Sequence, residues 1–124
     1  MLNTLVVFLG AGLGGALRHG VNVAAARLGG DFPAGTMLIN IAGSVLMGVL
    51  TGWFAVRGGV AQPWRLFLTT GVLGGFTTFS TFSLDAFLLV ERGALWGALV
   101  YVLGSVAAGI AGVAVSLAVI RTLG

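Results

Sequence analysis

Four long apolar segments take up nearly the whole of this 124-residue chain. They cover approximately residues 2–26, 34–56, 64–90 and 95–120. A helix needs about 20 mostly apolar residues to cross the hydrocarbon core of a bilayer. Each segment is long enough for that, and only short polar breaks separate one segment from the next. The sequence therefore predicts an all-α membrane protein with a single domain of four transmembrane helices.

The shortage of charged residues excludes most other classes of protein. Only 7% of the residues are charged, whereas a soluble domain carries about 25%. The six basic residues are single Arg near segment ends, so they form no basic patch and do not indicate nucleic-acid binding. With one His and no Cys, no nucleophile–base set or Cys-based metal site is available, and we do not expect an enzyme.

The positive charges hardly specify an orientation in the membrane. With four spans, three Arg lie on one side and two or three on the other, namely Arg57, Arg65 and Arg121 against Arg27, Arg92 and, if its side chain reaches outward, Arg18. The positive-inside rule then has little to act on. Two outcomes remain open at this point. The chain adopts one weakly specified topology, or it inserts in both orientations and two opposite copies pair as an antiparallel dimer.

The third segment departs from the pattern of a regular helix. The adjacent Gly74 and Gly75 precede five hydroxyl residues within positions 77–83, a composition that makes a poor continuous helix. A break at membrane depth is tolerated only where it is buried or lines a wet cavity. Such a break frees carbonyls for cations and a helix N-terminus for anions. Alternatively, the hydroxyls bond to the preceding turn and merely bend an ordinary helix.

Polar residues also follow one face of the second and the fourth segment. Thr36, Asn40 and Ser44 recur every four residues and therefore share a helix face. Polar groups inside a membrane often belong to a pathway, but they serve equally well as hydrogen-bonding contacts between helices, worth about 0.6 kcal/mol each. A packing surface is the preferred interpretation of the small and polar face of the fourth segment, made of Tyr101, Ser105, Gly109, Gly112 and Ser116. The GxxxG of the first segment, Gly10 and Gly14, is expected to pack as well.

Three motifs resemble those of the Fluc/CrcB family of fluoride exporters. The longest is Gly-Gly-Phe-Thr-Thr-Phe-Ser-Thr-Phe-Ser at residues 74–83, which resembles the third-helix signature of that family. Gly-Thr-Met-Leu-Ile-Asn at 35–40 resembles its second-helix motif, and Gly-Gly-Ala-Leu-Arg at 14–18 its first. The number of spans and the length also agree, so the resemblance covers essentially the whole chain.

The resemblance implies a passive, fluoride-selective channel that exports cytoplasmic fluoride across the plasma (inner) membrane. It also implies a dual-topology antiparallel homodimer with a broken third helix and two antiparallel pores. The positions that match the fluoride pathway of the family are Asn40, Phe79, Phe82, Tyr101, Ser105, Thr36 and Arg18. A structural Na⁺ is held in the family at the dimer interface by backbone carbonyls, and Gly74 and Thr77 of both subunits match those positions.

The chemistry of these residues is compatible with fluoride conduction. Fluoride is small and strongly hydrated, so a pore must replace water with donors that still release the ion. The amide of Asn40 offers two N–H donors. The edges of Phe rings carry partial positive charge, so Phe79 and Phe82 can touch an anion without binding it tightly. Without the resemblance, two Phe three residues apart would be interpreted as core packing.

Two departures from the family and two rival functions complete the sequence-based picture. Asp85 stands where many relatives have Glu, and Gly109 where some have Ser, which leaves that end of the polar track to backbone or water. A small dual-topology multidrug/proton antiporter needs a carboxylate in its first helix, and this first segment has none. A structural subunit of a membrane complex would explain the glycines but not the hydroxyl-rich segment.

Overall fold

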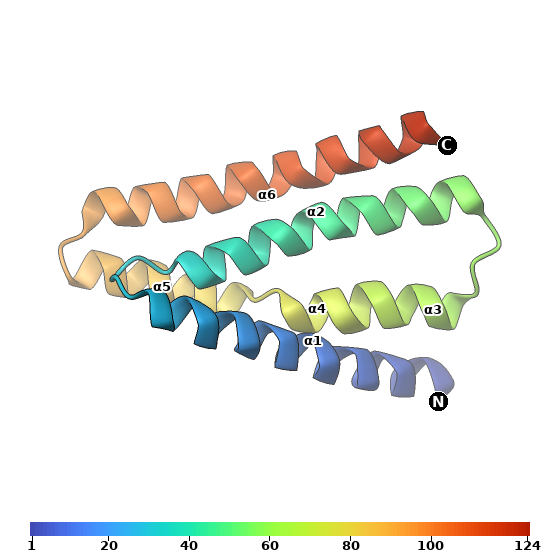
Figure 1. The fold of residues 1–124 in the computed structure, drawn as a ribbon, viewed down its shortest axis with the longest axis horizontal. Coiled ribbons are helices and arrows are strands. Elements are labelled where there is room, and N and C mark those ends of the chain that lie inside the picture. Colours follow the sequence, from blue (N-terminus) through green and yellow to red (C-terminus); the bar gives the residue numbers. More distant parts are fainter.

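The computed structural model describes all residues from 1 to 124 and contains four long helical rods lying side by side (Figure 1). Three rods are single helices, α1 (Leu2–Leu28), α2 (Ala34–Arg57) and α6 (Leu95–Leu123). The rod at Gln62–Glu91 is composed of α3 (Gln62–Leu66), the π-helix η1 (Phe67–Leu73), α4 (Gly74–Phe76) and α5 (Phe79–Glu91). All four rods are long and apolar enough to cross a membrane. The prediction of an all-α membrane protein with four spanning helices is confirmed.

Short loops connect the rods, and glycines end two of the helices. Gly29 follows α1 with φ 75° and Gly58 follows α2 with φ 61°, values that favour glycine because it lacks a Cβ. The chain reverses direction at each loop, so the N- and C-termini lie at the same end of the bundle (Figure 1). The α2–α3 connection shares that end, and the α1–α2 and α5–α6 loops lie at the opposite end (Figure 1).

The rods form two closely packed pairs. α2 runs along α6, and α1 runs along η1 and α4 of the third rod. α5 turns toward the other pair and packs against α6 (Figure 1). The small buried core lies at this end, where Leu89, Ala98 and Tyr101 are in contact and Phe82 packs against them.

Glycines make the contact between α1 and the third rod unusually close. A Cβ at Gly10 would lie 2.6 Å from the carbonyl oxygen of Phe67 and 2.9 Å from Cα of Gly71. A Cβ at Gly14 would collide with the carbonyl oxygen of Val72. The two backbones can therefore approach this closely only because Gly10 and Gly14 have no side chains. The expected packing role of Gly10 and Gly14 is confirmed.

The α2–α6 pair uses the same device over its second half. A Cβ at Gly52 would lie 2.9 Å from Cβ of Ile120, and one at Gly112 would lie 2.9 Å from Cγ2 of Val45. A Cβ at Gly48 would collide with the hydroxyl of Ser116. This part of the small-residue face of α6 is a packing surface, as expected.

The third rod departs from α-helical geometry at two places, in η1 and at Thr77 and Thr78. Its seven-residue π-helix, η1, was not anticipated from the sequence, and such wide turns often accompany functional sites. After α4, the backbone is extended at Thr77 (φ −82°, ψ 158°) and at Thr78 (φ −151°, ψ 118°), and helical geometry resumes at Phe79. The hydroxyl of Thr78 caps the new helix by accepting a hydrogen bond from the amide of Thr81 at 3.2 Å.

Candidate functional site

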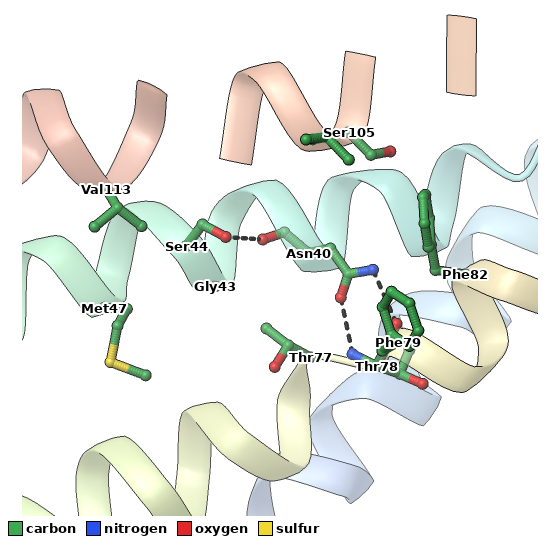
Figure 2. A pocket seen from close by; sticks show the side chains of 11 residues that line it. Asn40, Gly43, Ser44, Met47, Thr77, Thr78, Phe79, Phe82, Ser105 and Val113 are labelled. Carbon is green, nitrogen blue, oxygen red and sulfur yellow. Dashed lines mark hydrogen bonds between the residues drawn. The ribbon is translucent and has the colours of Figure 1, made fainter. Parts of the chain in front are cut away.

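A groove of about 350 Å³ lies between α2, the extended residues of the third rod, and α6 (Figure 2). Its lining combines amide, hydroxyl, aromatic and aliphatic groups, contributed by Asn40, Gly43, Ser44, Met47, Thr77, Thr78, Phe79, Phe82, Ser105, Val106 and Val113. The groove therefore brings together four of the predicted pathway residues: Asn40, Phe79, Phe82 and Ser105.

The side chain of Asn40 is hydrogen-bonded to the extended backbone of the third rod. Its Nδ2 donates to the carbonyl of Thr78 at 3.0 Å, and its Oδ1 accepts from the amide of Thr78 at 2.8 Å (Figure 2). Asn40 thus bonds to Thr78 as a neighbouring peptide group would. An Asn amide has two N–H donors, so one N–H of Asn40 remains for a ligand in the groove.

These hydrogen bonds determine which carbonyls near Thr77 and Thr78, the interruption of the third rod, keep their helical donors. In a continuous helix, the amide of Thr78 would bond to the carbonyl of Gly74, and the amide of Thr81 to the carbonyl of Thr77. Here the amide of Thr78 bonds to Asn40, and that of Thr81 bonds to the hydroxyl of Thr78. The carbonyls of Gly74 and Thr77 therefore lack their helical donors.

The neighbouring carbonyls are satisfied in a different way. The carbonyl of Gly75 accepts a hydrogen bond from Nε of Arg18 at 3.2 Å, and the carbonyl of Thr78 accepts the one from Asn40. Gly74 and Thr77, the two positions that match the cation ligands of the resembled family, thus keep carbonyls that have lost their helical donors. Unwound backbone carbonyls, as at Thr77, and carbonyls at the C-terminal end of a half-helix, as at Gly74, are typical Na⁺ ligands at membrane depth, so the residues present fit such an ion.

Aromatic rings continue from the groove into the core. The centroids of the Phe79 and Phe82 rings are 5.9 Å apart, and those of Phe82 and Tyr101 are 5.1 Å apart. Phe79 exposes 80% of its surface, whereas Tyr101 is fully buried. Phe82 is therefore held by packing on one side, and Phe79 has almost none within this chain.

Ser105 is the one buried polar side chain whose hydrogen bonding is incomplete. Its residue is 8% exposed, and its hydroxyl has no hydrogen-bond partner. It lines the groove from α6, on the side opposite the interrupted rod (Figure 2). Burying a hydroxyl without a partner costs about 1–3 kcal/mol, so Ser105 is an unfavourable residue at this position for stability alone.

The other predicted site residues lie outside the groove. Arg18 contacts the interruption from α1, through the carbonyl of Gly75. Tyr101 lies behind Phe82 and donates a hydrogen bond to Oδ2 of Asp85 at 3.0 Å, which supplies the partner that the sequence could not assign to Asp85. Thr36 lines a second cavity of about 360 Å³ at the end of the bundle that holds the α1–α2 loop, together with Asp85.

Thr78 is the principal site residue that sequence reasoning missed. It supplies both backbone atoms that Asn40 bonds, and its hydroxyl caps α5. The sequence contained a hint, because a Thr three residues before another polar residue and ahead of an apolar run is a common helix start. The five neighbouring hydroxyl residues concealed which one would serve as the cap.

Fold and site together define a class, a multi-pass helical membrane protein with a polar groove at an interrupted span. A family model described as "CrcB-like protein, Camphor Resistance (CrcB)" matches residues 5–117, and the chain belongs to this family. The relationship inferred from the three motifs is thereby confirmed.

Curated relatives are similar over their whole length. A protein of Methylobacterium nodulans is 82% identical over 124 residues, covering 100% of both chains, and bears the name "Fluoride-specific ion channel FluC". A protein of Methylobacterium sp. (strain 4-46) with the same name is 77% identical, again over 100% of both chains. "Fluoride-specific ion channel FluC 2" of Nitrobacter hamburgensis is 54% identical over 98% of this chain and 99% of its own. These relatives are named as channels, not as enzymes.

Proposed function

We propose that this protein is a passive, fluoride-selective channel that exports cytoplasmic fluoride across the plasma (inner) membrane. Membership of the CrcB family and the names of full-length relatives at 82% and 77% identity support fluoride as the ion. The observation that carries the proposal is the groove at the extended backbone of Thr77 and Thr78, where the Asn40 amide keeps one N–H beside two Phe rings. An anion in the groove would accept a hydrogen bond from that N–H.

Fluoride needs donors that are available but not too strong. Asn40 retains one free amide N–H, and Ser105, whose hydroxyl has no partner, lines the same groove. The start of α5 at Phe79 contributes too, because the first amides of a helix have no partner in the helix and favour anions. No Lys or Arg lines the groove, which is suitable for a pore because a fully charged partner would hold the ion too long.

The aromatic rings fit a role as weak anion contacts. The edge of a Phe ring is partially positive, so it attracts an anion without a conventional hydrogen bond. Phe79 and Phe82 both line the groove, with their centroids 5.9 Å apart. We infer that fluoride passes from the Asn40 amide along these rings. Tyr101, packed behind Phe82, and Thr36 belong to the continuation of this track, and Arg18 to its vestibule.

We infer that the working unit is an antiparallel homodimer with one pore for each copy. Phe79 lies at the groove with 80% of its surface exposed, so a second copy would complete that wall. Arg57 and Arg121 lie in the last turns of α2 and α6, at the end of the bundle that holds both termini (Figure 1), and Arg27 ends α1 at the other end. Such a weak charge bias permits both orientations.

A structural Na⁺ at the dimer interface would be held by the carbonyls of Gly74 and Thr77 from both copies. Both carbonyls have lost their helical donors to other acceptors, which supports this assignment. When bound, the ion would add positive potential close to the groove and favour anions over cations.

Export then follows from the physics of the ion. Weakly acidic HF crosses membranes, ionises in the more neutral cytoplasm and is trapped there as fluoride. A membrane potential of 100 mV, negative inside, drives one such charge outward with about 2.3 kcal/mol. A passive pore is sufficient for export, with no need for a nucleotide or a proton gradient.

Fluoride efflux from liposomes that contain the purified protein would test the proposal, with chloride efflux as the control anion. We expect rapid, fluoride-selective efflux that needs no pH gradient. Asn40→Asp and Phe82→Ile should each lower it by at least about tenfold, because each removes on the order of 1.4 kcal/mol of favourable interaction along the path. Gly15→Ala, which meets no atom within 4 Å, is the matched control.

The proposal would be overturned by a folded protein that passes no more fluoride than empty liposomes do. Efflux that required an opposing proton gradient would favour the antiporter instead. Equal passage of chloride would retain a channel but remove its fluoride selectivity.

A further inference from the structure

Asn40 makes two bonds with one peptide unit of the interrupted rod, and these two bonds have different consequences. Through Nδ2 it satisfies the carbonyl of Thr78 at 3.0 Å, and through Oδ1 it holds the amide of Thr78 at 2.8 Å (Figure 2). The second bond is the informative one. It occupies the only backbone donor that a continuous helix would give to the carbonyl of Gly74.

The amide of Thr78 therefore has two competing acceptors. If it bonds to the carbonyl of Gly74, the helix of α4 extends by a residue and that carbonyl is no longer free to bind an ion. If it bonds to Oδ1 of Asn40, the backbone stays extended at Thr77 and Thr78, as the ψ angles of 158° and 118° record. The side chain on α2 thus determines which state the third rod adopts.

A second contact from α2 acts on the adjacent residue. A Cβ at Gly43 would collide with Cγ2 of Thr77, so the absence of a side chain there lets Thr77 lie directly against α2. Thr77 is also fixed from its own rod, since its amide and its hydroxyl both donate to the carbonyl of Leu73 at 3.0 Å. Its carbonyl is consequently held in place while its helical donor, the amide of Thr81, bonds to Thr78.

We propose that Asn40 is a positioning residue for the cation site as well as a fluoride contact, and that its two amide atoms divide these tasks. Oδ1 keeps the carbonyl of Gly74 available for Na⁺ by holding the amide of Thr78. Nδ2, with its remaining N–H, serves the anion in the groove. This inference rests on the Na⁺ site of the proposed function. It makes Asn40 the physical link between the ion pathway and the centre of the dimer.

The division can be tested because two substitutions separate the two atoms. Asn40→Asp keeps an acceptor for the amide of Thr78 but loses the N–H donors. Asn40→Ala loses both and allows the amide of Thr78 to bond to the carbonyl of Gly74. Gly43→Ala leaves Asn40 intact but displaces Thr77, because its Cβ meets Cγ2 of Thr77. It is therefore a second way to perturb the same carbonyl pair.

The experiment is a Na⁺ titration of thermal unfolding of the purified protein without fluoride, at constant ionic strength with N-methylglucamine as the replacing cation. A ligand that binds only the folded state raises the unfolding midpoint as its concentration increases, which gives a Na⁺ half-saturation. Fluoride efflux is measured in parallel for each variant. Ser105→Ala is the contrast variant, since Ser105 lines the groove but its hydroxyl bonds to nothing on the interrupted rod.

We expect Asn40→Ala to raise the Na⁺ half-saturation by about tenfold, the equivalent of one lost hydrogen bond. Asn40→Asp should bind Na⁺ at least as tightly as the wild type, yet conduct as poorly as Asn40→Ala. Ser105→Ala should lower efflux severalfold while keeping the wild-type half-saturation. If Asn40→Ala does not fold, Asn40→Leu, which keeps a similar side-chain volume but neither amide atom, decides the question by the same increase.

Three results would count against the inference, and they can be told apart. An unchanged half-saturation in Asn40→Ala, or in Asn40→Leu where that variant decides, would remove the positioning role and leave the fluoride function intact. A half-saturation raised as much in Asn40→Asp as in Asn40→Ala would refute the division between the two atoms. A wild type that conducts fluoride but shows no Na⁺ dependence would overturn the cation site and, with it, the positioning role.

Discussion

The third rod presents two very different sides to the rest of the molecule. Toward α1 its contact surface is formed by glycines, and Gly71 and Gly75 lie against the backbone of α1. Toward α2 and α6 it borders a groove of about 350 Å³ with amide and hydroxyl groups in its lining. Both sides belong to the same apolar span, so hydropathy alone does not separate them.

The two sides of the third rod differ in the partners of its backbone hydrogen bonds. Along the glycine side, the helical turns remain intact up to Phe76, and the close contact leaves no room for movement. On the groove side, side chains take the place of the helical partners, with Asn40 bonded to Thr78 and the hydroxyl of Thr78 bonded to the amide of Thr81. The third rod is thus packed tightly against α1 through its first half and is interrupted immediately after it. A tightly packed half followed at once by an interruption is a sensible way to hold an ion site at membrane depth.

The strongest test of this contrast is a single methyl group on the glycine side. Gly14→Ala places a Cβ against the carbonyl of Val72 and 2.8 Å from the amide of Phe76, and neither backbone atom can move aside. Overpacking of this kind costs typically about 1–3 kcal/mol, so we expect a large loss of unfolding free energy in a detergent titration. Gly15→Ala meets nothing within 4 Å and should unfold as the wild type does. Equal behaviour of the two variants would refute the tight α1 contact.

A smaller effect is expected where the two Phe rings of the groove differ in their support. Phe82→Ile and Phe79→Ile should each reduce fluoride efflux by roughly tenfold, through loss of an aromatic edge worth about 1 kcal/mol. Only Phe82 packs against Tyr101 and the core, with ring centroids 5.1 Å apart. Unfolding free energy should therefore fall in Phe82→Ile alone. If Phe79→Ile is equally destabilised, a second copy covers that ring in the assembly.

Two serines of α6 provide a still finer comparison. Ser105 has no hydrogen-bond partner, whereas Ser116 donates to the carbonyl of Gly112 at 2.6 Å in the packed α2–α6 contact. We expect Ser105→Ala to lower efflux severalfold without loss of stability, because an unpaired buried hydroxyl itself costs about 1–3 kcal/mol. Ser116→Ala should leave efflux unchanged. The opposite pattern would place the pathway along the second half of α6.

The sequence was sufficient for the fold because the bilayer imposes it. Spans of apolar residues with Gly-rich faces predicted four packed helices, and Pro33 and Gly58 delimit α2 as such residues usually do. The composition of the segment from Gly74 to Ser83 also predicted a departure from a regular helix. It did not tell that the extended residues would be Thr77 and Thr78, since that depends on the amide of Asn40, which is 38 residues away in the chain.

The site was harder to predict because it depends on contacts between rods. Family resemblance indicated Asn40, Phe79, Phe82 and Ser105, which the structure brings together in one groove. Sequence spacing could not give the π-helix of η1, which packs closely against α1. Nor could it say which part of the small-residue face of α6 packs and which part lines the groove.

Gly109 lies at the boundary between these two parts and allows the most delicate test. A Cβ there would lie 3.4 Å from the hydroxyl of Ser44, which itself donates to the carbonyl of Asn40 at 2.8 Å. Gly109→Ser should fit with a small adjustment, so we expect unfolding free energy to change by less than about 0.5 kcal/mol. Efflux should stay within roughly twofold of the wild type, because 1.36 kcal/mol corresponds to tenfold and the change is far smaller. A tenfold loss of efflux with unchanged stability would instead mean that fluoride passes the bare backbone at Gly109, and that the pathway extends into the region assigned here to packing.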